Sequence, residues 1–262
     1  MMQKTRLKII LSWFILLSIH LGLCQEQSVT QGIIEAKRLI QQGCNHASAD
    51  EFEQAKSILT RWAAQGDRQA LAEYFLGYID YNLGVVVYRE EKEKAGSSLD
   101  SAVRHLEKAI EKDGSFAEAH ALLSSCYGIQ ISYSPMSGIW RGPKAGSEMG
   151  KAKALSPENP RVALLDAVGT YNTPALFGGG REKGFEALKK SAELFNRWKI
   201  VDSLQPDWGR EQVYAWIGLA YLDRNETILA RKAFEKALEI NPDYGWVKYV
   251  LIKKVTSDAD TH

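Results

Sequence analysis

Apolar residues recur along most of this chain with the 3.6-residue period of an amphipathic helix. In residues 210–255, apolar side chains fall at positions i, i+3, i+4 and i+7 almost throughout. The polar segment 223–227 interrupts the pattern, and the segment 241–245, which contains Pro242, ends it. The strict alternation of a half-buried β-strand is hard to find anywhere. The pattern therefore predicts an all-α protein whose helices come in pairs.

The last helix pair carries a specific spacing of small, aromatic and helix-ending residues. Its marked positions are Tyr214, Ile217, Gly218, Tyr221, Ala230, Phe234, Ala237 and Pro242. This spacing resembles the tetratricopeptide repeat. The residue types make physical sense, because small residues let two helices approach closely, larger ones fill the space around them, and a proline ends the second helix.

The same frame recurs more faintly toward the N-terminus. It is marked by Leu39, Gly43, Ala55, Leu59, Leu76, Gly77, Ala102, Leu106, Ala109, His120, Leu123, Ser124, Tyr127, Ala145, Met149, Ala152, Pro157, Gly184, Leu188 and Ser191. An array needs at least about three repeats to bury a continuous core. We therefore expect a right-handed α-solenoid of about five tetratricopeptide-like hairpins over residues 25–254. Residues 244–254 are expected to form a closing helix, and residues 255–262 a disordered tail.

The first 24 residues have the pattern of a secretory signal. Three basic residues precede an apolar run over residues 9–23, which is shorter than the roughly 20 residues that span a membrane. Small residues at Gly22 and Cys24 predict cleavage before Gln25. An uncleaved anchor and a lipid-modified Cys24 are the alternatives, and the bulky Leu23 argues against lipidation. We expect an exported protein, which resembles bacterial periplasmic or outer-membrane-associated proteins.

Composition narrows the classes of function. The formal net charge is +1, with 33 basic and 32 acidic residues, whereas nucleic-acid-binding proteins usually carry a strong basic excess. After cleavage only Cys44 and Cys126 would remain, without C-x-x-C spacing. Unpaired thiols are favoured over a disulfide between them, and no metal-binding signature is present.

Three segments break the short-turn pattern between the helices of a pair: residues 85–98, 128–146 and 172–180. In a stack of hairpins all such turns lie on one edge, so enlarged turns in succession predict one continuous surface. A fourth irregular segment, residues 196–212, joins hairpins on the opposite edge. We expect it to be structural, with its two tryptophans, Trp198 and Trp208, packed there.

Aromatic and cationic residues in the second and third of these segments form the candidate binding surface: Tyr133, Met136, Trp140, Arg141, Phe177 and Arg181. Two interpretations stay open. The side chains either cap the neighbouring hairpins, or bind a partner or ligand.

The glycine run at 178–180 invites comparison with phosphate-binding loops, but it lacks their motifs. A P-loop needs Ser or Thr after its lysine, and Lys183 is followed by Gly184. A dinucleotide fingerprint starting at Gly178 would need glycine at position 183. An anion held near Arg181 and Lys183 at the start of a helix is the weaker possibility, and a turn that requires glycine is the stronger one.

No arrangement of titratable residues indicates catalysis. The histidines beyond residue 24 (His46, His105, His120 and His262) are scattered, and the carboxylates alternate with lysines on helix faces. We therefore expect neither an enzyme nor a cofactor or metal protein.

The sequence favours a repeat protein that holds a protein or peptide partner, on its turn edge or on its concave face. The concave candidates are Gln212, Ala215, Leu219 and Leu222 in the last repeat, with Glu118, Ala121 and Ser125 in the middle one. The alternative is a small-ligand-binding protein, as in the T components of tripartite transporters, which resemble this chain as exported repeat proteins. A membrane contact would come through an uncleaved signal segment or an envelope partner.

Overall fold

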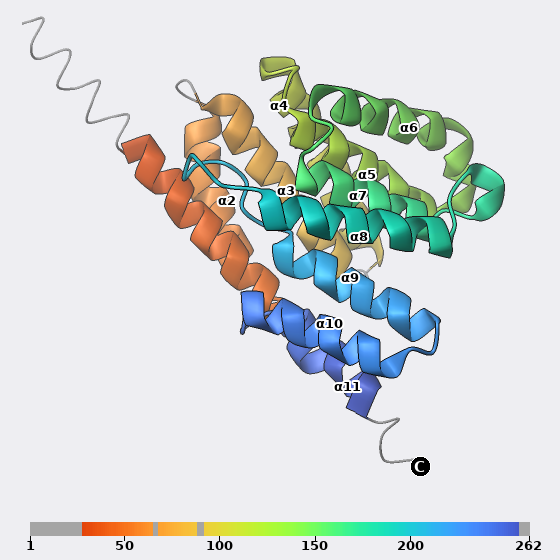
Figure 1. Ribbon diagram of the computed structural model, residues 1–262. Coiled ribbons are helices and arrows are strands. Elements are labelled where there is room, and N and C mark those ends of the chain that lie inside the picture. Colours follow the sequence, from red (N-terminus) through yellow and green to blue (C-terminus); the bar gives the residue numbers. More distant parts are fainter. Residues whose placement is uncertain (1–27, 65–67, 88–91, 257–262) are drawn as a thin grey trace, which may run out of the picture.

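The protein is described by a computed structural model over residues 28–64, 68–87 and 92–256. Within these ranges the chain forms helices and turns without a β-strand. A helix over residues 28–46 is followed by α2 (Ala49–Ala63), α3 (Gln69–Val87), α4 (Lys92–Lys112), α5 (Ala117–Tyr133), η1 (Pro135–Ser137), α6 (Gly138–Leu155), α7 (Pro160–Asn172), η2 (Ala175–Phe177), α8 (Arg181–Arg197), α9 (Arg210–Asp223), α10 (Thr227–Ile240), η3 (Trp246–Leu251) and α11 (Ile252–Thr256) (Figure 1).

Consecutive helices pack in pairs, as the sequence predicts. The helix over 28–46 pairs with α2, α3 with α4, α5 with α6, α7 with α8, and α9 with α10, while η3 and α11 close the end against α10. The predicted closing helix is present, but its first part, η3, is π-helical. The prediction of an all-α solenoid of tetratricopeptide-like hairpins is confirmed.

Small residues at the predicted close-contact positions allow each pair to approach. A Cβ atom added to Gly218 would lie 2.2 Å from the ring of Phe234, and one added to Gly184 would lie 2.4 Å from the Cα atom of Tyr171. A larger residue would therefore displace the buried Phe234 ring at the first position and the backbone of α7 at the second. The glycines set the distance between the helices of the fourth and fifth hairpins.

The prediction that residues 128–146 form an enlarged turn is wrong for most of that segment. Helix α5 continues to Tyr133 and α6 begins at Gly138, so only η1 and Ser134 separate them. Pro143 lies inside α6 rather than in a loop. Residues 128–133 extend α5, and residues 138–146 form the first part of α6. Helix α6 is held on the core by apolar side chains such as Ala145 and Met149. The segment 85–98 is also largely helical where it is described.

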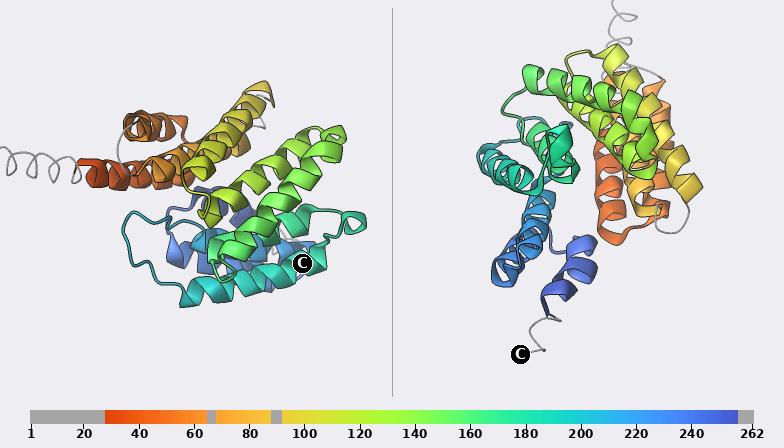
Figure 2. Two further views of the ribbon diagram at one scale, coloured as in Figure 1. Left: turned by 90° about the horizontal axis from the view of Figure 1, so that it is seen from above. Right: turned by 90° about the vertical axis from the view of Figure 1, so that its right-hand side faces the viewer.

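The array curves until its last hairpin returns to its first helix (Figure 2). The side chain of Asn241 donates to Asn45 Oδ1 at 2.8 Å, and Gly245 packs on the carbonyl of Asn45. The ammonium group of Lys37 donates to the carbonyls of Ser203 and Gln205 at 2.6 and 2.7 Å. The superhelix is therefore closed across its centre by contacts between residues far apart in sequence.

The predicted signal segment, residues 1–24, and most of the predicted tail lie outside the described residues. Within the described ranges, no helix is both long and apolar enough to cross a membrane.

Candidate functional site

The turns between α5 and α6, α7 and α8, and α9 and α10 lie on the same side of the molecule, at the right in Figure 1. Six apolar side chains at these turns are half to almost fully exposed: Met136 (74%), Ile139 (75%), Trp140 (55%), Leu176 (89%), Phe177 (75%) and Ile228 (74%). Exposed apolar groups gathered in one region of a soluble protein usually mark an interaction surface. We call this surface the turn edge.

The corner between α5 and α6 is held rigidly by polar contacts behind the exposed residues. The hydroxyl of Tyr133 donates to the carbonyl of Gly84 at 3.1 Å, which ties the end of α5 to α3. The hydroxyl of Ser137 donates to the carbonyl of Ser134 at 2.7 Å. Tyr133 therefore anchors the corner, whereas Met136 and Trp140 extend from it into solvent.

Arg141 is fixed beside the exposed indole of Trp140. Its Nε donates to Gln130 Oε1 at 2.9 Å, and the amide of Gln130 donates to Asp100 at 2.7 Å. The guanidinium carbon lies 6.0 Å from the ring centroid of Trp140. This chain of contacts joins α4, α5 and α6 and gives the guanidinium a defined orientation.

The glycine run between α7 and α8 is required by the backbone. Gly178 and Gly180 have φ angles of +84° and +132°, which strongly favour glycine, and a Cβ atom on Gly179 would lie 2.2 Å from the carbonyl oxygen of Thr173. The ammonium of Lys183 donates to the carbonyl of Gly178 at 2.7 Å. The run builds a tight loop from which Leu176 and Phe177 project.

Arg181 contacts the protein itself. Its guanidinium carbon lies 4.4 Å from the ring centroid of Tyr171, and Nη1 lies 3.1 Å from Asp223 Oδ2. The hydroxyl of Tyr171 donates to the same carboxylate at 2.5 Å, and burial together with this bond raises the pKa of Tyr171 to about 12. Arg181 therefore braces α8 against α7 and α9.

The six candidate residues thus divide by what they contact. Met136, Trp140 and Phe177 are exposed on the turn edge, together with Ile139 and Leu176, which were not among the predicted residues. Tyr133 and Arg181 have structural contacts, and Arg141 has one structural bond with its terminal nitrogens left over. The pattern of apolar residues does not indicate that Ile139 is exposed, because in sequence an apolar residue at the start of a helix looks like a core residue.

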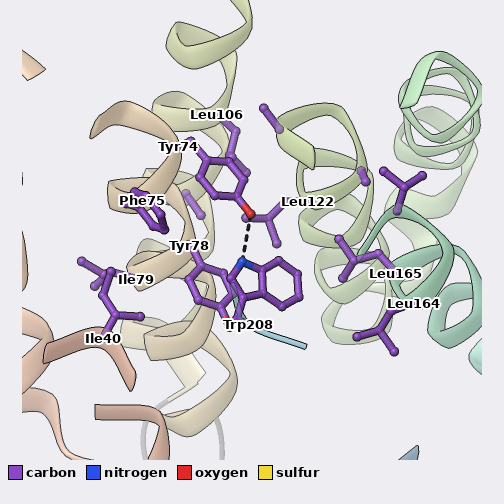
Figure 3. Close-up of a cluster of buried hydrophobic side chains, with 14 of the residues drawn as sticks. Ile40, Tyr74, Phe75, Tyr78, Ile79, Leu106, Leu122, Leu164, Leu165 and Trp208 are labelled. Atoms are coloured by element: carbon purple, nitrogen blue, oxygen red, sulfur yellow. Dashed lines mark hydrogen bonds between the residues drawn. The ribbon is translucent and has the colours of Figure 1, made fainter. Parts of the chain in front are cut away.

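The centre of the concave face is occupied by the end of the chain's own segment 198–209, which was not expected when this face was predicted as a candidate partner surface. Trp208 is buried in the centre of the array, stacked on Tyr78 at 4.6 Å between ring centroids, and its Nε1 donates to Tyr74 at 3.0 Å (Figure 3). In the same view Leu164 of α7 lies on the side of the indole away from Tyr78, and Leu122 of α5 lies next to the hydroxyl of Tyr74.

Three of the seven predicted concave residues are buried, whereas Gln212, Leu219, Leu222 and Ser125 are half-buried. The buried ones are Ala215, Ala121 and Glu118, and Gln212 donates to the hydroxyl of Tyr78 at 3.2 Å. Glu118 accepts from the buried guanidinium of Arg161 at 3.3 Å. The sequence predicts that Trp208 packs within residues 196–212, on the edge opposite the enlarged turns. Nothing in the sequence indicates its contact with Tyr74 of α3, 134 residues away.

A small cleft lies between the helix over 28–46 and the start of α9. Its volume is about 10 Å³, room for a single water molecule, and its wall includes Lys37, Cys44, Tyr78, Asp207 and Glu211. Burial raises the pKa of the Glu211 carboxyl, and burial raises the pKa of the Cys44 thiol to about 12. Neither Trp140 nor Phe177 lines this cleft, and it is too small for an organic ligand.

Other buried polar contacts join the helices of a pair and were not foreseen from sequence. His120 Nδ1 lies 2.5 Å from Glu148 Oε2, and His105 Nδ1 lies 2.5 Å from Glu73 Oε2. Burial raises the pKa of Glu148, but hydrogen bonds from Lys151 and His120 outweigh it, so that the pKa is lowered overall. Among the described residues, no group of three or more potential ligands is arranged to hold a metal ion. Cys44 and Cys126 are both unpaired.

Comparison with known proteins supports the fold. No protein-family model matches the chain, and no curated protein matches it. Among solved structures, the HusA haemophore from Porphyromonas gingivalis is similar with a TM-score of 0.59 and 22% identity, covering 72% of this chain and 92% of that one. A thermophilic tetratricopeptide-repeat protein from Thermus thermophilus is similar with a TM-score of 0.58 and 16% identity, covering 86% and 98%.

At these identities the comparisons establish architecture alone. The chain is an all-helical protein with a tetratricopeptide-like fold, similar over most of its length to the two solved structures. Folds of this kind serve many functions, so the particular role has to be argued from the surface.

Proposed function

We propose that this protein is a non-catalytic repeat protein that binds a protein partner through the turn edge. The observation that carries the proposal is the contrast between two surfaces. The centre of the concave face is occupied by Trp208, whereas Met136, Trp140 and Phe177 are exposed on turns that polar contacts hold in place. Rigid aromatic and methionine side chains lose little conformational entropy on binding and often dominate interface energies.

The predicted signal segment supports a partner in the cell envelope, and we infer that this partner is an exported or outer-membrane-associated protein. The charge of the whole chain, +1, does not favour nucleic acid as the partner. The array would then act as a scaffold or adaptor that presents one edge.

Affinity capture from an extract of the cells that produce the protein tests the proposal. We expect a Trp140→Ser/Phe177→Ser variant to lose the captured protein at least tenfold, since each anchor residue is worth about 1–2 kcal/mol or more at an interface. The matched control is Val201→Ser, because Val201 is 85% exposed in segment 198–209, on the opposite edge. Equal capture by the double variant and the control would contradict a turn-edge site.

A planar apolar ligand such as haem is the second candidate. The likeness to a haemophore over 92% of that chain motivates it, and the exposed thioether of Met136, on the same corner as Trp140, favours it on this chain. Titration with haem should then give a Soret shift that Met136→Leu abolishes. The absence of any saturable shift would remove this candidate and leave the protein-binding proposal intact.

A further inference from the structure

On the turn edge, the acidic side chains of the last two turns are in ion pairs, whereas several basic side chains are not. Glu182 is paired with Arg224, Glu226 accepts from Arg224 Nε at 2.8 Å, and Asp223 is paired with Arg181 at 3.1 Å. The carboxylates of the last two turns therefore already have cationic partners within the protein.

Three cations on the same edge contact groups that carry no negative charge. Arg141 donates its Nε to an amide oxygen, Lys144 lies 5.9 Å from the ring centroid of Tyr127, and Lys183 donates to a backbone carbonyl. The first turn of α6 contains no acidic residue. Among the described residues, none of these three cations has a carboxylate within ion-pair distance.

Arg141 adds geometry to this charge. Its Nε is used inside the protein, and its two terminal nitrogens make no hydrogen bond to the described residues. A planar guanidinium held in one orientation pairs bidentately with a carboxylate, and such a pair is more directional than a contact with a lysine. The guanidinium of Arg141 lies beside the ring of Trp140, so a partner whose carboxylate binds Arg141 could place an apolar side chain against Trp140.

We propose that the turn edge recognises an acidic amphipathic segment of its partner, in which carboxylates face Arg141, Lys144 and Lys183 while apolar side chains contact Trp140 and Phe177. This inference rests on the proposed function and names the chemistry of the partner. Charge complementarity of this kind accelerates association and rejects partners of the wrong sign, and the apolar contacts supply most of the affinity.

Binding to two designed peptides measures the sign of the charge that the edge prefers. One labelled peptide carries Leu and Phe at helical spacing with Glu at its polar positions, and the other has Lys in place of each Glu. At low salt we expect the acidic peptide to bind at least tenfold more tightly, and this difference should shrink in about 0.5 M salt because exposed charges are screened. Equal binding of the two peptides, or binding of neither, would overturn the inference.

A charge-neutralising variant locates the effect. Arg141→Gln/Lys144→Gln/Lys183→Gln should weaken binding of the acidic peptide about tenfold, since three exposed pairs contribute roughly 0.5 kcal/mol each. Lys108→Gln/Lys190→Gln/Lys232→Gln removes the same charge from exposed positions on other parts of α4, α8 and α10 and should change binding less than about twofold. Equal effects of the two variants would mean that net charge alone is measured, which would overturn the assignment to the turn edge.

The same variants separate this inference from the proposed function. If the charge-neutralising variant captures the cellular partner as well as the unchanged protein does, while Trp140→Ser/Phe177→Ser does not, the turn edge is a binding site but its partner is not acidic. A last experiment measures binding to an anionic lipid surface, in the form of phosphatidylcholine vesicles that contain about 30% phosphatidylglycerol. If the charge-neutralising variant loses vesicle binding but not peptide binding, the edge recognises a membrane surface and the peptide assignment is wrong.

Discussion

Single residues decide how closely the helices of this array pack, and the glycines show it most directly. A Cβ atom on Gly184 would lie 2.4 Å from the Tyr171 backbone, whereas Gly150, also inside a helix, has nothing within 4 Å of such an atom. The two glycines have the same intrinsic cost in a helix but different neighbours.

Gly184→Ala should therefore lower the free energy of unfolding by about 1–3 kcal/mol, the usual cost of overpacking against backbone. Gly150→Ala should raise it by about 0.5–1 kcal/mol, because alanine is the better helix former at an uncrowded position. Urea denaturation of both variants measures the difference. A loss of similar size at both positions would contradict the close approach of α7 and α8.

Glu211 provides a residue-scale test of pH dependence. Burial raises its folded-state pKa, the nearby charge of Asp207 adds to the shift, and a hydrogen bond from Gln41 opposes it. Between the ordinary carboxyl pKa and this raised value, the folded protein binds more protons than the unfolded chain, so stability falls as pH rises through that window.

Glu211→Gln should remove this fall. We expect the variant to be more stable than the unchanged protein at neutral pH and equally stable below the ordinary carboxyl pKa, where both side chains are neutral. Free energies of unfolding between about pH 4 and 8 measure the two profiles, and parallel profiles would show that Glu211 does not titrate in a buried site.

At the scale of elements, segment 198–209 links the fourth and fifth hairpins to the first helix and to α3. Lys37 holds two of its carbonyls, and Trp208 fills the space between α3, α5 and α7. An open solenoid transmits contacts only between neighbouring repeats, so a segment of this kind changes the protein from an open array to a closed one.

Trp208→Ala should cost about 3–5 kcal/mol of stability, as expected when a buried tryptophan is truncated. Trp140→Ala, at the exposed turn edge, should change stability by no more than about 0.5 kcal/mol. Denaturant unfolding of the two variants compares the buried Trp208 with the exposed Trp140. A large loss for Trp140→Ala would mean that the turn edge is part of the core.

The sequence predicted the helices and their pairing better than the contacts between distant helices. The period of apolar residues and the positions of Gly218, Ala230 and Phe234 define the helix pairs, because these features are local. The position of Trp208 at the centre of the concave face was not predictable, since its contact with Tyr74 depends on how tightly the whole array curves.

The turn edge was predicted in part, for the same physical reason. Met136, Trp140 and Phe177 lie there, as apolar residues near breaks in the helical pattern. The bracing roles of Tyr133 and Arg181 depend on tertiary contacts with Gly84 and Asp223, which no local pattern encodes.

At the scale of the molecule, contacts between its ends close the array, and we propose its turn edge as the surface for recognition. The exposed apolar side chains, the cations without carboxylate partners and the rigid turns occur together at one side, and Trp208 occupies the centre of the groove that repeat proteins commonly use. The central claim is therefore about location: partners bind at the turns and not in the concave face.

Hydrogen–deuterium exchange of the protein with and without its captured partner tests this claim most directly. We expect protection on binding in residues 134–142 and 173–181, while exchange in residues 203–209 and in α9 stays unchanged. Protection or release of segment 203–209, with no change at the turns, would show that the partner enters the concave face and would contradict the account.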